Sequence, residues 1–105
     1  MSQVKPLTLL AAAASDVEKA VRHYDHLSPG LGHAFLLDLD ELLTHVKHHP
    51  EMFQAVRGQV RRAVFHGFPY SLLYRIHVGR IEVIGVLPSR GDPERIAARL
   101  RRPRQ

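Results

Sequence analysis

Arginines are the residues of this sequence best suited to bind a charged partner. Residues 57–105 contain eleven arginines, no lysine and three acidic residues, which gives this half a formal charge of +8. Four of the arginines lie in or beside segments with a strand pattern: Arg61, Arg62, Arg75 and Arg90. A planar guanidinium group binds phosphate or carboxylate through two parallel hydrogen bonds. The sequence therefore indicates a surface for a nucleic acid or an acidic polypeptide.

The same arginines could serve in RNA cleavage. Without a metal ion, this reaction needs a base for the 2′-hydroxyl proton, an acid for the leaving oxygen and cations beside the phosphate. An arginine stays protonated and cannot be the base. His66 is the better candidate, because it ends an arginine-bearing strand pattern before a turn, and His77 is the second. On the alternative interpretation, both histidines are ordinary half-exposed strand residues.

Three further histidines have the spacing of metal ligands. His45, His48 and His49 share one face of a predicted helix, and Glu41 is the nearest carboxylate at helical spacing. We expect a solvated helix end there, and neither a metal nor a cofactor. The chain has no cysteine, which excludes disulfides and is compatible with a reducing, cytoplasmic setting. Its longest apolar run is far shorter than the ~20 residues of a membrane-spanning helix, so we expect no membrane partner.

Two amphipathic helices precede the arginine-rich half. Apolar residues recur at helical spacing within 12–27 and 31–48, and Ser28-Pro29-Gly30 separates the two ranges. Such a short connection predicts an antiparallel helical hairpin. Ser15 and Glu18 have the spacing of a capping box, although the alanines before them can extend the first helix backward by a turn.

After residue 58 the apolar period changes to alternation. This alternation predicts three antiparallel strands joined by turns, near 60–66, 71–78 and 81–87. The last of them is the most apolar and should be central. A weak strand near 5–10 precedes the helices, and Asp92 and Pro93 can open a short final helix.

These elements predict one α+β domain over residues 1–105, in which the helical hairpin packs on one face of an antiparallel sheet. The opposite face should be free, and Arg61, Arg75 and Arg62 are candidates to line this face or its edge. The basic tail 101–105 is expected to be mobile. The predicted core consists of Phe35, Leu39, Leu42, Val46, Tyr74, Ile76, Val83 and Ile84.

Several short motifs, in order and at matching spacing, resemble the RelE/ParE superfamily of toxins over roughly residues 13–99. The helical hairpin resembles that of the superfamily in Tyr24, the run 29–32 and Phe35. The remaining motifs are His49–Phe53, Val60–Ala63, Phe68–Tyr70, Tyr74–Ile76, Val83–Leu87 and Arg90–Pro93. The resemblance implies a β-α-α-β-β-β fold and the toxin half of a type II toxin–antitoxin pair of the plasmid stabilisation type.

Two departures from the superfamily pattern bear on the mechanism. Pro88 stands where many members have a histidine, and the last tyrosine and histidine of the chain are Tyr74 and His77. The ribonuclease members tend to carry such a residue near the C-terminus. The resemblance therefore implies a ParE-like toxin that inhibits DNA gyrase by binding.

Two alternatives remain. The first is a RelE-like, ribosome-dependent mRNA endoribonuclease, whose catalytic residues would be His66, Arg61, Arg62, Arg75 and Arg90. The second is a nucleic-acid-binding domain, which the scarcity of exposed aromatic residues for base stacking disfavours. The two toxin interpretations imply an antitoxin with a short acidic segment that wraps the domain. Arg61, Arg62, Arg75 and Arg90 are the expected contacts for the antitoxin or the target.

Overall fold

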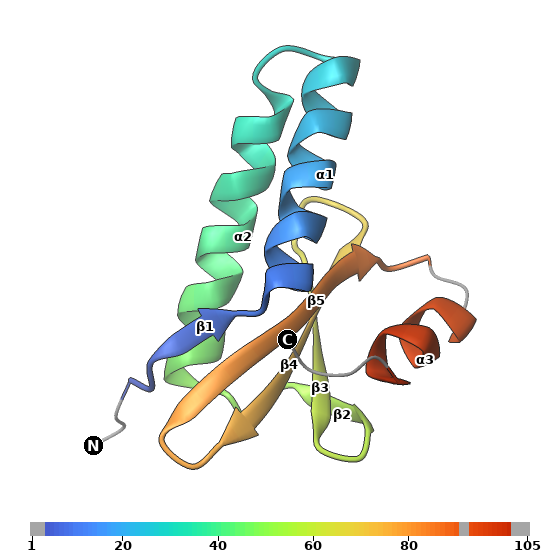
Figure 1. Cartoon of the computed structure of the whole chain (residues 1–105). Helices are drawn as coiled ribbons and strands as arrows, with labels where there is room; N and C mark the ends of the chain where they lie inside the picture. The colour runs from blue at the N-terminus through green and yellow to red at the C-terminus, as the bar shows by residue number, and fades with distance from the viewer. Residues whose placement is uncertain (1–3, 91–92, 102–105) are drawn as a thin grey trace.

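A computed structural model describes residues 4–90 and 93–101 of the chain (Figure 1). It confirms the α+β fold and the predicted order of the main elements. A helix cap was expected at Asp92, and mobility was expected in the basic tail. Asp92 and residues 102–105 lie outside the described residues. The elements are β1 (Leu7–Leu9), α1 (Ala11–Leu27), α2 (Leu31–His48), β2 (Gln54–Arg57), β3 (Val60–Val64), β4 (Tyr70–His77), β5 (Arg80–Pro88) and α3 (Pro93–Arg101).

The sheet has five strands in the order β1-β5-β4-β3-β2. β3, β4 and β5 form the predicted antiparallel meander, and β1 joins it in parallel with β5. The exposed strand β2, which pairs with β3, was not predicted. β5 is an interior strand but not the central one, because β2 extends the sheet on the opposite side and leaves β4 in the middle.

The helical hairpin covers one face of the sheet, as predicted (Figure 1). Gly30, at φ 88°, makes the turn between α1 and α2 in a conformation that favours glycine. Asp25 accepts a hydrogen bond from the backbone N–H of Gly32 at 2.8 Å, which ties the end of α1 to the start of α2. Phe35 is fully buried at the centre, where its ring stacks on Tyr24 and Phe65.

The opposite face is only partly free. The short helix α3 packs on β5 through Ile96 and Leu100, away from the hairpin (Figure 1). A second apolar cluster lies beneath it, made of Val60, Leu73, Ile84 and Leu87. The expectation of an uncovered face was therefore wrong for the β5 side of the sheet.

A β-bulge explains how β5 contributes to both clusters. Leu73 pairs with Gly85 and Tyr74 pairs with Val83, so Ile84 is an extra residue opposite β4. Val83 consequently packs against the hairpin, while Ile84 packs against α3. Both are buried, as are the other predicted core residues except Ile76, which is half-buried at the rim of the hairpin-side cluster.

Candidate functional site

Three arginines from three neighbouring strands lie on the face of the sheet that α3 leaves open. Arg62 of β3 pairs with Leu73, and Arg75 of β4 pairs with Val60. Leu73 and Val60 belong to the second apolar cluster, so both arginines lie on the same side of the sheet as that cluster and α3. Arg57 of β2 also pairs with Val60 and lies in the same row across the strands. We call Arg57, Arg62 and Arg75 the arginine face. Arg57 was not among the predicted site residues, because β2 has no clear strand pattern.

The three side chains are held to different degrees. Arg62 is half-buried, and its Nε donates to Ser71 Oγ at 3.0 Å while its Nη2 donates to the Ser89 carbonyl at 3.4 Å. Arg75 is also half-buried and Arg57 is exposed. Among the side chains that the structure describes, which leave out those of residues 93–95, neither Arg75 nor Arg57 makes a hydrogen bond or ion pair. The face thus combines one oriented guanidinium group with two that are available to a partner.

Arg61 does not belong to this surface, which corrects the sequence expectation. It pairs with Tyr74 and therefore points to the hairpin side of the sheet. Its Nη1 donates to the backbone carbonyls of Phe53 at 2.6 Å and Glu51 at 3.2 Å. Arg61 consequently fastens the segment that leads into β2.

Tyr74 is unsuited to act as a base. The side chain is fully buried, and its hydroxyl donates to the backbone carbonyl of Pro50. Burial raises the pKa of Tyr74 to about 12, and the positive charge of Arg61 only partly offsets this effect. The phenol is therefore protonated at neutral pH.

Arg90 lies beside the arginine face but outside its strands. The residue is exposed and follows Ser89, whose carbonyl accepts the hydrogen bond from Arg62. The backbone N–H of Ser89 donates to the Pro69 carbonyl at 2.8 Å and fixes this exit segment to the turn before β4. Arg90 is thus a peripheral member of the predicted set.

The structure separates His66 from the arginine face and brings His77 to it. His66 is exposed and lines a groove between α2 and β3 on the hairpin side. His77 lies on the same side of β4 as Arg75, and its Nε2 is 3.1 Å from Glu82 Oε1. Glu82 in turn pairs with Arg75 across the strands. The histidine beside the arginines is therefore His77.

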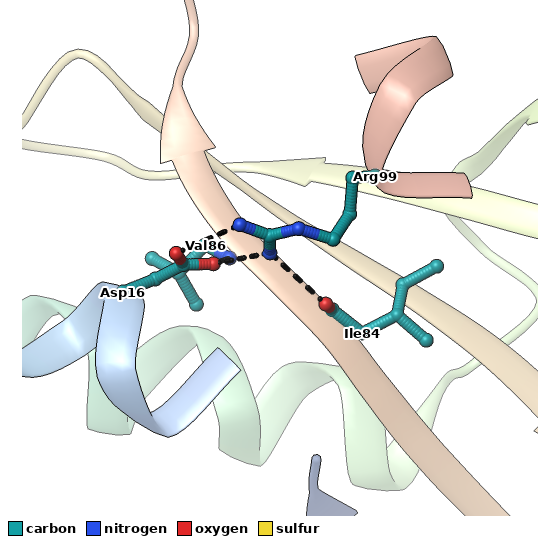
Figure 2. A network of polar contacts seen from close by, with 4 residues as sticks. All are labelled: Asp16, Ile84, Val86 and Arg99. Atoms are coloured by element: carbon teal, nitrogen blue, oxygen red, sulfur yellow. Dashed lines mark hydrogen bonds and ion pairs between the residues drawn. The ribbon is translucent and has the colours of Figure 1, made fainter. Parts of the chain in front are cut away.

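An ion pair that was not predicted lies at the edge of β5, between Asp16 and Arg99 (Figure 2). Asp16 Oδ2 and Oδ1 lie 2.6 and 3.0 Å from Arg99 Nη1 and Nη2, respectively. The hydrogen bond to Asp16 is the main cause of a raised pKa for the Arg99 guanidinium group. Gly85 was the available signal, because a Cβ at this position would lie 2.8 Å from Arg99 Nη1.

The described residues offer little for other classes of site. No group of three histidine, aspartate or glutamate side chains among them is placed to hold a metal ion. No helix in the described ranges has the length and apolar character to cross a membrane.

Comparison with known proteins identifies the family. The sequence matches the family described as ParE toxin of type II toxin-antitoxin system, parDE, over residues 7–93. A comparison with curated protein sequences gave no significant match. Among solved structures, the chain is similar to one titled "Chromosomal ParDE TA system from P. aeruginosa", with 18% identity and a TM-score of 0.73. The similarity covers 81% of this chain and 96% of the other, and at this identity it shows the fold alone. Because the family match spans most of the sequence, the chain belongs to the ParE toxin family of type II toxin–antitoxin systems.

Proposed function

We propose that this toxin inhibits DNA gyrase by binding and that an acidic segment of its cognate antitoxin neutralises it. The observation that carries the proposal is the arginine face. Arg75 and Arg57 lack hydrogen-bond partners within the described ranges, while the expected base His66 lies on the other side of the sheet. Such a surface suits recognition of an acidic partner better than proton transfer. Gyrase and an antitoxin would meet the toxin in the cytoplasm.

Arg62 gives this surface its orientation. Ser71 Oγ accepts from Arg62 Nε and lies 2.7 Å from Ser89 Oγ, so the guanidinium group is fixed before any partner arrives. A fixed donor loses less conformational freedom on binding than a solvated side chain does. An antitoxin carboxylate on Arg62 and Arg75 would occupy the donors that gyrase needs. Neutralisation would then follow from competition for one surface.

A supercoiling assay tests the proposal. Purified toxin should inhibit DNA supercoiling by gyrase, and Arg62→Gln with Arg75→Gln should weaken the inhibition. Arg22→Gln is the matched control, because Arg22 is an exposed arginine on α1, outside the arginine face. Full gyrase activity in the presence of folded wild-type toxin would contradict the proposal.

The His77–Glu82 pair favours one alternative, a ribosome-dependent endoribonuclease. Glu82 can orient the His77 imidazole, and Arg75 beside it can stabilise charge on a phosphate. In this case the wild type should cleave ribosome-bound mRNA at defined codon positions. His77→Ala should abolish the cleavage and His66→Ala should leave it intact. Intact mRNA with the wild type, together with gyrase inhibition, would support the binding mechanism.

A further inference from the structure

A pocket of about 430 Å³ lies at the edge of β5, beyond Val83, where the pairing with β1 ends. Its lining residues come from α1, β4, β5 and α3, and the ion pair of Asp16 and Arg99 joins the two helices at this point (Figure 2). Pockets of roughly 300–1,000 Å³ are typical binding sites for small molecules. No residue of the arginine face lines this pocket, so a ligand here would bind at a separate site.

The edge of β5 in this pocket is unsuited to a further strand. The Val86 N–H already donates to Asp16 Oδ2 at 2.9 Å. The next residue that faces outward is Pro88, which has no N–H to donate. The Val86 carbonyl faces outward with its N–H, and no group that the structure describes donates a hydrogen bond to it. The edge therefore offers a small molecule one acceptor, whereas a pairing strand would also need free donors.

The side chains of the pocket select an anion. Asp16 is the carboxylate among the described lining residues, and its two oxygens already accept from the Val86 N–H and from both Nη atoms of Arg99. Lys19 and His23 lie one turn apart on α1, so their side chains are neighbours at the mouth of the pocket. Both are exposed, and neither forms an ion pair with another side chain that the structure describes. The pocket thus has positive charge that no acid of its own lining neutralises.

The floor of the pocket is apolar. Val86 and Leu87 are buried, and Pro88 is half-buried beside them. The half-buried ring of Tyr70 adds an aromatic surface to the lining. Aromatic rings of this kind stack on the flat rings of nucleobases. The ligand that fits the whole pocket therefore combines an anionic group with a flat ring.

We propose that this pocket binds a nucleotide through its terminal phosphate group. The phosphate would lie between Lys19 and His23, because a doubly charged group with three acceptor oxygens matches two neighbouring donors better than a single carboxylate does. The base would lie against Tyr70 and Pro88, and a sugar hydroxyl or a base amino group would donate to the Val86 carbonyl. Arg99 stays bound to Asp16. This binding is a property of the free toxin and depends on neither gyrase nor the antitoxin.

A titration of ¹⁵N-labelled toxin with adenosine 5′-monophosphate (AMP) gives the first test. We expect saturable shifts of the Lys19, His23 and Leu87 amides, with a Kd below about 1 mM. Adenosine and inorganic phosphate should each bind at least ~10-fold more weakly, because each retains only part of the contacts. Shifts confined to the arginine face would overturn the proposal. An affinity for inorganic phosphate or for adenosine equal to that for AMP would also overturn it.

Matched variants of α1 give the second test. Lys19→Gln should weaken AMP binding about 10-fold, and Lys19→Arg should restore most of the affinity because it keeps the charge. Arg22→Gln is the control, because Arg22 is an exposed cation of the same helix that lines a different pocket. His23→Gln should weaken binding less, since the amide retains an N–H donor. Equal affinities of Lys19→Gln and Arg22→Gln would overturn the proposal.

Oligonucleotides distinguish the two sources of such a phosphate, a free nucleotide and the 5′ end of a nucleic-acid strand. Single-stranded tetranucleotides with and without a 5′-phosphate are titrated, and the shifts at Lys19 and His23 are measured. Tighter binding of the phosphorylated strand than of AMP would assign the pocket to a strand end, and tighter binding of AMP would assign it to a free nucleotide. Equal shifts with both tetranucleotides and none with AMP would overturn the proposal, because the terminal phosphate would then contribute nothing.

Discussion

Asp16 and Arg99, 83 residues apart in the sequence, form a two-pronged ion pair across the edge of β5 (Figure 2). β1 pairs with β5 only as far as Val83, where the chain turns into α1. The next backbone groups on this edge find side-chain partners instead. The Val86 N–H donates to Asp16 Oδ2 at 2.9 Å, and the Ile84 carbonyl accepts from Arg99 Nη1 at 3.2 Å. The pair thus continues the edge and fastens α3 to α1.

Removal of either partner should destabilise the fold. Only 8% of the Asp16 side chain and 14% of the Arg99 side chain are exposed, so each single variant leaves a nearly buried charge without its partner. We expect Asp16→Ala or Arg99→Ala to lower the free energy of unfolding by about 3 kcal/mol. The double variant should cost much less than the sum of both, as a urea-denaturation cycle would show. Additive losses would mean that the two side chains act independently. Asp40→Ala is the control, because Asp40 is an exposed residue of α2.

Gly85→Ala should act through the same ion pair. A Cβ at residue 85 would lie 2.8 Å from Arg99 Nη1 and 3.6 Å from Asp16 Oδ2. The guanidinium group would have to move, which should cost about 1–3 kcal/mol of stability. In the Arg99→Ala background the added methyl group should cost little. An equal loss in both backgrounds, measured by urea denaturation, would place the strain in the strand itself.

Phe35→Ala should lower the free energy of unfolding by ~3–5 kcal/mol, the range for a buried aromatic residue. The Phe35 ring is fully buried and contacts Tyr24, Phe65, Phe68 and Tyr70. Leu37→Ala is the control on the same helix, because 57% of Leu37 is exposed. A loss below ~1 kcal/mol for Phe35→Ala in a denaturation series would contradict the packing described above.

The toxin should lose stability in alkali because of Tyr74. Its pKa is about 12 in the folded chain, against an ordinary value near 10 in the unfolded chain. The folded state therefore holds this proton more tightly, and the resulting stability is complete below pH 10 and is lost as the pH rises toward 12. Denaturation at several pH values should show a decline of roughly 1–3 kcal/mol over this range. Tyr74→Phe should flatten the decline, and an unchanged slope would assign it to other groups.

Periodicity was sufficient to predict the two helices and the meander, because one face of each element is buried. It could not reveal β2, whose residues are all exposed and carry no alternation. The apparent capping box misled for a related reason. α1 begins at Ala11, and Asp16 inside it faces β5, a contact that no local pattern records.

The candidate site divides in the same way. Alternation along β3 predicts that Arg61 and Arg62 face opposite sides of the sheet, but it does not predict which of these sides the helical hairpin covers. Tyr74 decides which side this is, because it is buried under the hairpin. Arg61 pairs with Tyr74 and therefore lies on the same side of the sheet. The position of His77 beside Arg75 depends likewise on the hairpin turn at Gly79, which sets Glu82 opposite Arg75. Long-range register therefore decided which basic residues share a surface.

The arginine face should govern the salt dependence of antitoxin binding. Arg62 and Arg75 share the open side of the sheet, so Arg62→Glu with Arg75→Glu should repel an acidic segment that the wild type attracts. We expect the double reversal to weaken binding at least ~10-fold at low salt and to flatten the dependence of affinity on ionic strength, because fewer favourable charge contacts remain to be screened. Calorimetric titrations at several salt concentrations measure both effects. Arg22→Glu with Lys19→Glu is the control, because it makes the same change in net charge on α1. Equal weakening by the two double variants would mean that the net charge of the toxin alone attracts the partner. An affinity that changes neither with salt concentration nor with the double reversal would mean that apolar contacts hold the antitoxin.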